Sequence, residues 1–434
     1  MSPLARVREL AHAFTQPSAL TLFFFGFSSG LPFLLIGGTL SGWLQQAHIA
    51  LDAIGLVSYL GLSYSFKFLW SPAVDRVRLP WLARLLGQRR SWLLLAQCVL
   101  ALALLGMAAV QPQRDFGLFL LFGALVAFAG ATQDTAIDAY RIEIAPPELQ
   151  GTLASIYVLG YRIALIASGA VVLILAQHIG WSAAYRIMAA LLLVPILTVL
   201  LVREPTQHRA RARDLRSALQ DSVIGPFRQF YTHYGRRLAL LLLGFILLFQ
   251  VSGQMLAPMA LPFYLASGFK LEQIAEISKI YGVAVSLLGA FAGGAVVLRW
   301  GAERSMPWVL AAAAASNLLF PLMSLHPGSL PVFALVILGD NFSGGLLGTV
   351  AIAFLSDLTD HRYTATQYAL YSSLTVLGGR LLAGLSGFAV AGLGYTGFFV
   401  LTALTGVPAL LLWFALRPAL WRHREVAARI APAE

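Results

Sequence analysis

The sequence of 434 residues is poor in charge, because Asp, Glu, Lys and Arg make up 11% of it, against about a quarter in soluble domains. Together with 59% hydrophobic residues, this excludes an ordinary soluble domain and predicts an all-α polytopic membrane protein. The single cysteine, Cys98, excludes an intrachain disulfide, and no cysteine or histidine cluster has metal-ligand spacing. The sequence also lacks HExxH, GxSxG and phosphate-binding glycine motifs, so we expect no enzyme activity, no cofactor and no metal site.

Long apolar runs dominate the chain instead. Runs of bilayer-spanning length, about twenty residues, lie at 18–41, 53–74, 91–110, 116–140, 152–177, 183–202, 238–265, 273–298, 305–325, 330–356, 364–392 and 395–416. The arginine-rich stretch 203–237 divides them into six and six. We predict twelve transmembrane helices in two six-helix bundles, 1–202 and 238–434, with a basic cytoplasmic linker at 203–237 and a short cytoplasmic tail. This is the layout of the major facilitator superfamily.

The loop charges agree with this topology. Arginine and lysine gather in alternate loops, and the predicted outer side has only Arg114 and Lys270, besides Arg186 just inside a span end. Because cytoplasmic loops carry the positive excess in membrane proteins, both termini are predicted to be cytoplasmic. The same rule explains the net charge of +11 without a nucleic-acid partner. The expected environment is the lipid bilayer.

Charged residues interrupt the end of the fourth predicted helix. Asp134, Asp138 and Arg141 are spaced i, i+4 and i+7, so they share one helix face. An ionised group at membrane depth costs free energy, and such groups usually face a protein interior or a water-filled cavity. We interpret the two carboxylates as part of a substrate or proton-coupling site. The alternative is a helix end already in the cytoplasm, which suits Arg141 and Glu143 best.

Other polar residues lie within predicted spans. Lys67 could pair with a carboxylate of the fourth helix, or its side chain could extend to the cytoplasm. Arg162 lies about three turns into its span, which favours a functional role. Glu276 and Lys279 are three residues apart and are expected to neutralise each other. The remaining substrate-binding candidates, for which interhelical hydrogen bonds are the open alternative, are Gln250, Gln254, Asp340, Asn341, Gln367, Tyr371 and Arg380.

The loop after the second span carries a further pattern. Asp75-Arg76 is followed by Gly87 and by Arg89-Arg90. This resembles the acid–arginine pair, glycine and two basic residues that the major facilitator superfamily has in this loop. We predict that Asp75, Arg76, Arg89 and Arg90 act in conformational gating by holding cytoplasmic helix ends together. Ordinary cytoplasmic charge is the alternative for the arginines.

Several segments of the chain, when taken together, are specific enough to indicate a family. They are Gly26-Phe-Ser-Ser-Gly-Leu-Pro32 with Gly37-Gly-Thr-Leu40, Phe66-Lys-Phe-Leu-Trp-Ser-Pro72 with Asp75-Arg76, Thr132-Gln-Asp-Thr-Ala-Ile-Asp-Ala139, Val158-Leu-Gly-Tyr-Arg162, and Ala365-Thr-Gln-Tyr-Ala-Leu370 with Gly379-Arg380. This combination resembles the AmpG-type anhydromuropeptide permeases of the major facilitator superfamily. One departure is Asp340, where the family form has a glutamate before the asparagine.

The resemblance implies a function and a set of site residues. Permeases of this type import GlcNAc-1,6-anhydroMurNAc peptides across the bacterial inner membrane by proton symport, for peptidoglycan recycling and β-lactamase induction, and hence β-lactam resistance. The chain is then expected to act as a monomer on a small-molecule substrate, with protons as coupling ion at Asp134 or Asp138. The residues implied by the resemblance are Lys67, Asp75, Gln133, Asp134, Asp138, Arg162 and Arg380.

A second family leaves the substrate open. Acetyl-coenzyme A transporters share a related Gln-Asp-x-x-x-Asp helix, here Gln133 to Asp138. The alternative function is therefore transport of acetyl-CoA or another large organic anion, which the arginine-rich helices would also suit.

Overall fold

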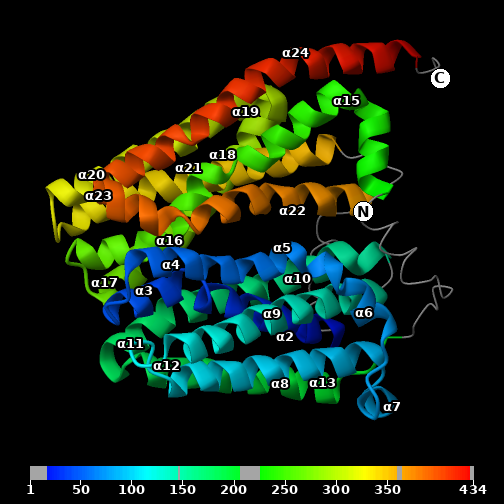
Figure 1. Cartoon of the computed structure of the whole chain (residues 1–434). Helices are drawn as coiled ribbons and strands as arrows, with labels where there is room; N and C mark the ends of the chain where they lie inside the picture. The colour runs from blue at the N-terminus through cyan, green and yellow to red at the C-terminus, as the bar shows by residue number, and fades with distance from the viewer. Residues whose placement is uncertain (1–16, 145–146, 206–224, 359–363, 431–434) are drawn as a thin grey trace, which may run out of the picture. The chain divides into compact units, whose positions relative to one another are not determined.

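The computed structural model describes residues 17–144, 147–205, 225–358 and 364–430, which form helices and connections without a β-strand (Figure 1). The contacts divide the chain into two compact units. Unit 1 is Met1–Ile49, Leu60–Leu215 and Lys270–Ala275, and unit 2 is Ala50–Tyr59, Arg216–Phe269 and Glu276–Glu434. Each unit is thus a helical bundle drawn mainly from one half of the sequence.

The first half of the chain begins with a helix in two parts and a second span in five. Its elements are α2 (Pro17–Leu35), α3 (Gly38–Gln46), α4 (Leu51–Val57), η1 (Ser58–Gly61), α5 (Leu62–Phe66), η2 (Lys67–Leu69), α6 (Ser71–Arg76), α7 (Leu82–Leu86), α8 (Gln88–Ala109), α9 (Phe116–Ile144), α10 (Pro147–Ile166), η3 (Ala167–Val171), α11 (Val172–Ile179), α12 (Trp181–Leu191) and α13 (Leu193–Leu201). The expected second span, 53–74, is therefore not one continuous α-helix. Pro72 has no N–H to donate to the carbonyl of Phe68, so α5 ends at Phe66 and the chain resumes an α-helix at Ser71.

The second half contains α15 (Gly225–Leu248), α16 (Val251–Ala266), α17 (Leu271–Ile274), η5 (Ala275–Tyr281), α18 (Gly282–Trp300), α19 (Ala302–Ser316), η6 (Asn317–Leu319), α20 (Pro321–Leu325), α21 (Leu330–Asp357), α22 (Thr364–Ala383), α23 (Ser386–Leu404) and α24 (Gly406–Ile430). Two of these helices are interrupted by glycine. Gly235 in α15 has φ +70°, and Gly394 in α23 has φ +66°, a region that favours glycine. Gly394 falls between the eleventh and twelfth expected spans.

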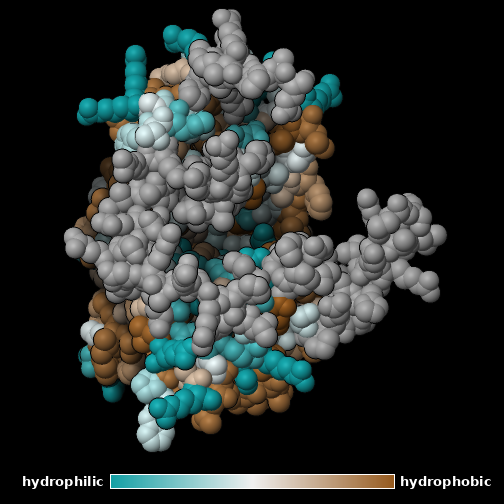
Figure 2. Space-filling model, turned by 90° about the vertical axis from the view of Figure 1, so that its right-hand side faces the viewer, coloured by the Kyte–Doolittle hydropathy of each residue, from teal (hydrophilic) through white to brown (hydrophobic). Residues whose placement is uncertain are grey.

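Ten helical stretches among the described residues are long and apolar enough to cross a membrane. Two shorter apolar helices, Leu51–Phe66 and Ser373–Ala383, overlap the second and eleventh expected spans. The chain is a multi-pass membrane protein, and the full count of twelve stays a prediction. Large apolar side chains are exposed on both units, for example Leu201 at 83% and Leu298 at 91%, as expected for surfaces that meet lipid. Figure 2 shows such hydrophobic areas along the flanks, around hydrophilic residues.

In unit 1, α2 and α10 pack with their backbones in contact. A Cβ on Gly26 would lie 2.0 Å from the carbonyl oxygen of Tyr157, and one on Gly160 would lie 2.0 Å from that of Phe23. Only glycine allows such an approach, which is common between membrane helices. The contact fixes how α10 is rotated against α2, and it therefore positions the polar side chains that follow Gly26.

In unit 2, the corresponding close pair is α18 and α21. A Cβ on Gly289 would lie 2.1 Å from the carbonyl oxygen of Phe342, and one on Gly345 would lie 2.1 Å from that of Ser286. A separate apolar core fills the unit, where the rings of Phe245 and Trp413 are 5.0 Å apart. The position of α21 in the bundle is thus set by glycine contacts on α18.

Candidate functional site

Asp134 on α9 ends a hydrogen-bond chain that crosses three helices of unit 1. The hydroxyl of Tyr157 on α10 donates to Ser29 Oγ on α2 at 2.8 Å, and Ser29 Oγ donates to Asp134 Oδ1. The glycine contact between α2 and α10 brings these two hydroxyls together. The carboxylate of Asp134 therefore faces protein and not lipid, as an intramembrane acid requires.

Lys67 lies beside both carboxylates of α9. Its Nζ is 3.4 Å from Asp138 Oδ2, and it also interacts electrostatically with Asp134. The predicted pairing of Lys67 with a carboxylate of the fourth helix is confirmed. The side chains of Lys67 and Asp138 are 33% and 46% exposed, so this ion pair is open on one side. We call Lys67, Asp134 and Asp138 the unit 1 acid cluster.

Arg141 and Tyr157 lie next to the unit 1 acid cluster. The guanidinium carbon of Arg141 is 5.9 Å from the centre of the Tyr157 ring, within the range of a cation–π contact. Arg141 is half-buried rather than fully in solvent. Tyr157 was only one of many tyrosines in the sequence, and no spacing rule singled it out. Its role depends on the rotation of α10 against α2.

The side chain of Gln133 lies in a different environment from that of its neighbour Asp134. Its side chain is completely buried, its Oε1 accepts a hydrogen bond from Ser28 Oγ at 2.6 Å, and its Nε2 donates to the carbonyl of Ser28 at 2.8 Å. Gln97 Nε2 donates to the same Ser28 hydroxyl at 3.3 Å. Gln133 therefore joins α9 to α2, and it positions Asp134 without reaching a surface.

Arg162 lies on another face of α10. The face that packs on α2 carries Tyr157, Gly160 and Tyr161, whereas Arg162 is exposed between the exposed side chains of Leu159 and Ile163. No hydrogen bond or ion pair joins Arg162 to another described residue. The structure thus does not bring Arg162 into the unit 1 acid cluster.

A second charged group of unit 1 surrounds Arg89 at the start of α8. Arg89 Nη1 is 2.5 Å from Asp75 Oδ1 on α6, and Arg89 Nη2 is 2.6 Å from Glu143 Oε1 at the end of α9. The side chain of Arg89 is 11% exposed. One guanidinium therefore ties the ends of three helices together. The side chain of Arg76 lies outside the described residues.

Glu204 completes this group, although no sequence pattern indicated it. Its Oε1 accepts the backbone N–H of Arg89 at 2.7 Å, and its Oε2 accepts that of Arg90 at 3.1 Å, so the carboxylate caps the N-terminus of α8. Gly87 makes room, because its φ is +90° and a Cβ there would lie 2.4 Å from Glu204 Cγ. The Arg90 guanidinium donates to the carbonyls of Val199 and Leu200 at the end of α13.

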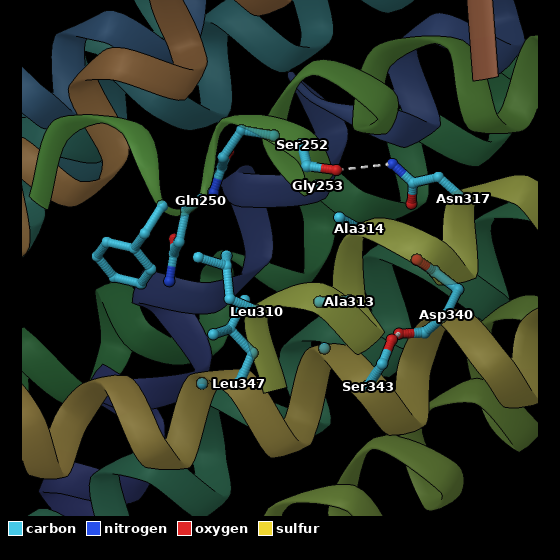
Figure 3. Close-up of a pocket in the computed structure, with 14 residues that line it drawn as sticks. Gln250, Ser252, Gly253, Leu310, Ala313, Ala314, Asn317, Asp340, Ser343 and Leu347 are labelled. Atoms are coloured by element: carbon cyan, nitrogen blue, oxygen red, sulfur yellow. Dashed lines mark hydrogen bonds between the residues drawn. The ribbon is translucent and has the colours of Figure 1, made fainter. Parts of the chain in front are cut away.

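Unit 2 contains a cavity of about 210 Å³ between α16, α19 and α21, lined by both polar and apolar residues (Figure 3). Asn317 Nδ2 donates to Ser252 Oγ at 2.9 Å and to Thr402 Oγ1 at 3.0 Å. The side chains of Gln250, Gln254, Ser343 and Asp340 also line it, together with small residues. Asn317 and Ser252 were not singled out in the sequence, although an asparagine within an alanine-rich span was a usable signal.

Asp340 is the one charged residue that lines this cavity among the described residues. The ammonium group of Lys279, on η5, interacts electrostatically with its carboxylate. Glu276 is exposed, while Lys279 is half-buried. The expectation that Glu276 neutralises Lys279 is wrong, because the two side chains form no ion pair and, among the described residues, only Asp340 acts electrostatically on Lys279.

The other expected residues of unit 2 divide into three groups. Asn341 donates to the carbonyl of Ile337 within α21 at 3.2 Å and packs on Gly282. The assignment of Tyr371 to substrate contact needs correction, since its ring is fully buried in the apolar core, 5.5 Å from Phe230. Arg380 is half-buried on α22, next to Gly379, where α22 meets Gln254. The side chain of Gln367 lies outside the described residues.

Residues 19–339 match the Major Facilitator Superfamily. The Anhydromuropeptide permease of Escherichia coli (strain K12) is 32% identical over 409 residues, which cover 94% of this chain and 81% of that protein. The Putative transporter AmpG 4 of Rickettsia conorii is 32% identical over 394 residues, 90% of this chain and 94% of that protein. The chain belongs to the AmpG-type permeases of the major facilitator superfamily.

Solved structures show the same fold for this AmpG-type permease. The nucleoside transporter NupG superposes with a TM-score of 0.72 at 16% identity, covering 92% of this chain and 98% of that chain. A bacterial homologue of the human lysosomal transporter Spinster superposes with a TM-score of 0.71 at 15% identity, covering 94% and 97%. At such low identity the likeness concerns the fold alone. By its family and its fold, the permease is thus a membrane transporter of small molecules.

Proposed function

We propose that this permease imports anhydromuropeptides, GlcNAc-1,6-anhydroMurNAc peptides, across the bacterial inner membrane by proton symport. The observation that carries this proposal is the match to the Escherichia coli permease over nearly the whole chain, including the segments that hold the unit 1 acid cluster. The imported peptides would enter peptidoglycan recycling and β-lactamase induction. The proposed topology places both termini in the cytoplasm. The proposed oligomeric state is a monomer.

Proton coupling is assigned to the unit 1 acid cluster. Two carboxylates, Asp134 and Asp138, share one lysine, so the cluster carries an excess negative charge when both acids are ionised. An uncompensated charge at membrane depth is costly. A proton taken up from outside removes this charge and favours the conformational change of the loaded carrier. Release of that proton to the cytoplasm resets the cluster.

Substrate contacts are assigned to the basic and amide groups that reach a surface. Lys67, Arg162 and Arg380 suit the carboxylates of a stem peptide, because charge-assisted hydrogen bonds to carboxylates are strong. Gln250, Gln254 and Asn341 suit amide and hydroxyl groups, and the carboxylate of Asp340 suits an amine. Gln133 acts through the position of Asp134. Asp75, Arg89 and Arg90, with Glu143 and Glu204, hold helix ends of unit 1 and serve gating.

Uptake by inverted or right-side-out vesicles tests the function. Labelled anhydromuropeptide is expected to accumulate above its external concentration when an inward proton gradient is imposed, and to equilibrate only when the gradient is collapsed. Unlabelled anhydromuropeptide should compete, whereas acetyl-CoA should not. Competition by acetyl-CoA with no effect of anhydromuropeptide would instead establish transport of a large organic anion.

A further inference from the structure

We propose that a groove of unit 2, between α18 and α19, binds an anionic phospholipid. The headgroup phosphate binds Arg304 at the end of the groove nearest the turn between these helices, and an acyl chain lies along its apolar part. The groove shares no lining residue with the cavity beside Asp340. This inference goes beyond the proposed function and does not depend on the identity of the transported substrate.

The groove forms because α18 and α19 both pack on α21 and leave a space between them. Glycine holds α18 close, since a Cβ on Gly293 would lie 2.9 Å from the carbonyl oxygen of Leu346 on α21. The side chain of Leu346 lies at the base of the groove, and Val296 of α18 and Val309 of α19 line its sides. The volume of about 440 Å³ and this apolar lining suit a segment of an acyl chain.

The turn between α18 and α19 places this groove at a membrane surface. Two stretches that are long and apolar enough to cross a membrane, Leu271–Trp300 and Ala302–Leu325, are joined by Gly301 alone. Gly301 has φ +78°, which favours glycine, and its carbonyl accepts a hydrogen bond from Ser305 Oγ at 2.8 Å. The residues on both sides of Gly301 therefore lie where the bilayer meets water, the depth of lipid headgroups.

The charges beside the groove are positive. Arg304 is exposed and forms no hydrogen bond or ion pair with another described residue. The guanidinium carbon of Arg299 is 5.3 Å from the centre of the Trp300 ring, which lines the groove. The acid of this turn, Glu303, accepts a hydrogen bond from Trp421 Nε1 on α24 at 2.8 Å and does not line the groove. A phosphate group would thus meet guanidinium groups, which suit phosphate oxygens.

Two exposed indole rings line the same groove. The side chain of Trp300 is 54% exposed and that of Trp308 is 78% exposed. Anchoring at the membrane surface would explain either ring by itself. A groove with an apolar base, two indoles and an exposed arginine offers more, because it fits both parts of a lipid. Basic pockets between membrane helices bind anionic headgroups in this way.

The test uses brominated lipids as quenchers of tryptophan fluorescence, with the full-length protein in nanodiscs. The signal of the groove is the difference between the unchanged protein and the Trp300→Phe/Trp308→Phe double variant. Brominated phosphatidylglycerol should quench this signal at a roughly twenty-fivefold lower mole fraction than brominated phosphatidylcholine, since each of the two arginines favours an anionic lipid about fivefold. Equal quenching by the two lipids would overturn the proposal.

Variants then assign the headgroup to Arg304. Arg304→Gln should reduce the preference for phosphatidylglycerol about fivefold without changing the binding of phosphatidylcholine. Arg304→Lys keeps the charge and should keep most of the preference. Arg237→Gln, on an exposed arginine of α15 that does not line the groove, is the matched control. An equal loss in Arg304→Gln and Arg237→Gln would show attraction to the overall positive charge and would reject the site.

Soluble phosphates distinguish a lipid from a free anion. Inorganic phosphate and glycerol phosphate in excess should not relieve quenching by phosphatidylglycerol, because they leave the apolar part of the groove empty. Relief by either compound would assign the groove to a soluble phosphate and overturn the lipid assignment. The measurement involves no transport, so absence of anhydromuropeptide uptake would reject the proposed function and leave this site standing.

Discussion

The two units each place a lysine against a carboxylate, but they balance the charges differently. In unit 1, Lys67 forms an ion pair with Asp138 and also interacts electrostatically with Asp134. In unit 2, Lys279 interacts electrostatically with Asp340 without forming an ion pair with it. In each half the lysine comes from the second span and the carboxylate from the fourth. In unit 2, the cavity has one carboxylate, Asp340, among its described lining residues. We therefore propose proton coupling in unit 1 and substrate contact in unit 2.

The hydrogen bonds around these charged residues also differ between the two units. In unit 1, Tyr157 and Ser29 donate to Asp134 in a chain from α10 through α2 to α9. In unit 2, hydrogen bonds around the cavity join uncharged groups, such as Asn317, Ser252 and Thr402. A proton site needs an acid whose charge can be removed, whereas uncharged donors and acceptors suit contacts with the neutral groups of a substrate. The predictions that follow change one side of this comparison at a time.

The largest effect is expected from Asp138→Asn, which leaves one carboxylate for Lys67 and makes unit 1 as balanced as unit 2. Accumulation of labelled anhydromuropeptide against its gradient should be lost, because no excess charge remains for a proton to remove. Exchange of internal for external substrate should continue, since substrate binding is kept. Uptake and counterflow in the same vesicles measure both. Asp115→Asn, an exposed acid before α9, is the matched control, and unchanged uphill uptake in Asp138→Asn would refute this role.

Arg89→Gln should strongly destabilise unit 1, since it leaves Asp75 and Glu143 facing each other without a cation. Breaking a buried pair costs about 3–5 kcal/mol, and the low end applies because Asp75 is half exposed. Thermal unfolding in detergent measures the loss. Arg84→Gln, on an exposed arginine of α7, should leave the melting temperature unchanged. A similar loss of melting temperature in both variants would show that the overall positive charge, and not the ion pairs of Arg89, stabilises unit 1.

Gly26→Ala and Gly345→Ala compare the two glycine contacts directly. Each added methyl meets a backbone carbonyl, of Tyr157 in unit 1 and of Ser286 in unit 2, so each should cost about 2 kcal/mol, a typical value for overpacking. We expect Gly26→Ala to impair proton-driven uptake and Gly345→Ala to lower the affinity for anhydromuropeptide. Gly38→Ala is the control, because nothing lies within 4 Å of its added Cβ. Identical functional defects in the two variants would contradict the division of roles.

The smallest effect is expected from Tyr157→Phe, which removes the first donor of the chain to Asp134. Loss of one hydrogen bond costs about 1 kcal/mol, so proton-driven uptake should fall roughly fivefold. Tyr185→Phe removes a hydroxyl that donates to the carbonyl of Leu35 at 2.7 Å, away from the acid cluster. Tyr185→Phe should lower the melting temperature as much as Tyr157→Phe does, but it should leave the uptake rate unchanged. Equal uptake by both variants would remove Tyr157 from the coupling site.

The sequence predicted the class of fold and part of the site. The helical spacing of Asp134 and Asp138, and the pairing of one of them with Lys67, followed from the cost of charges in a membrane. The break in the second span and the burial of Tyr371 did not follow, because hydropathy alone does not show which face of a helix packs inwards. Glu204 was missed because it lies in a loop, where an acid has no signal of its own.

Composition and loop charge therefore determined that the chain crosses a membrane many times and which residues carry charge within it. Spacing along one helix is set by the backbone, so residues such as Asp134 and Asp138 share a face whatever surrounds them. Partners on different helices are set by rotation and close approach, which depend on contacts such as Gly26 against Tyr157 and Gly282 against Asn341. Only the tertiary structure could decide that Lys67 pairs with Asp138 and that Lys279 does not pair with Glu276, because sequence spacing does not show which side chains of neighbouring helices approach each other.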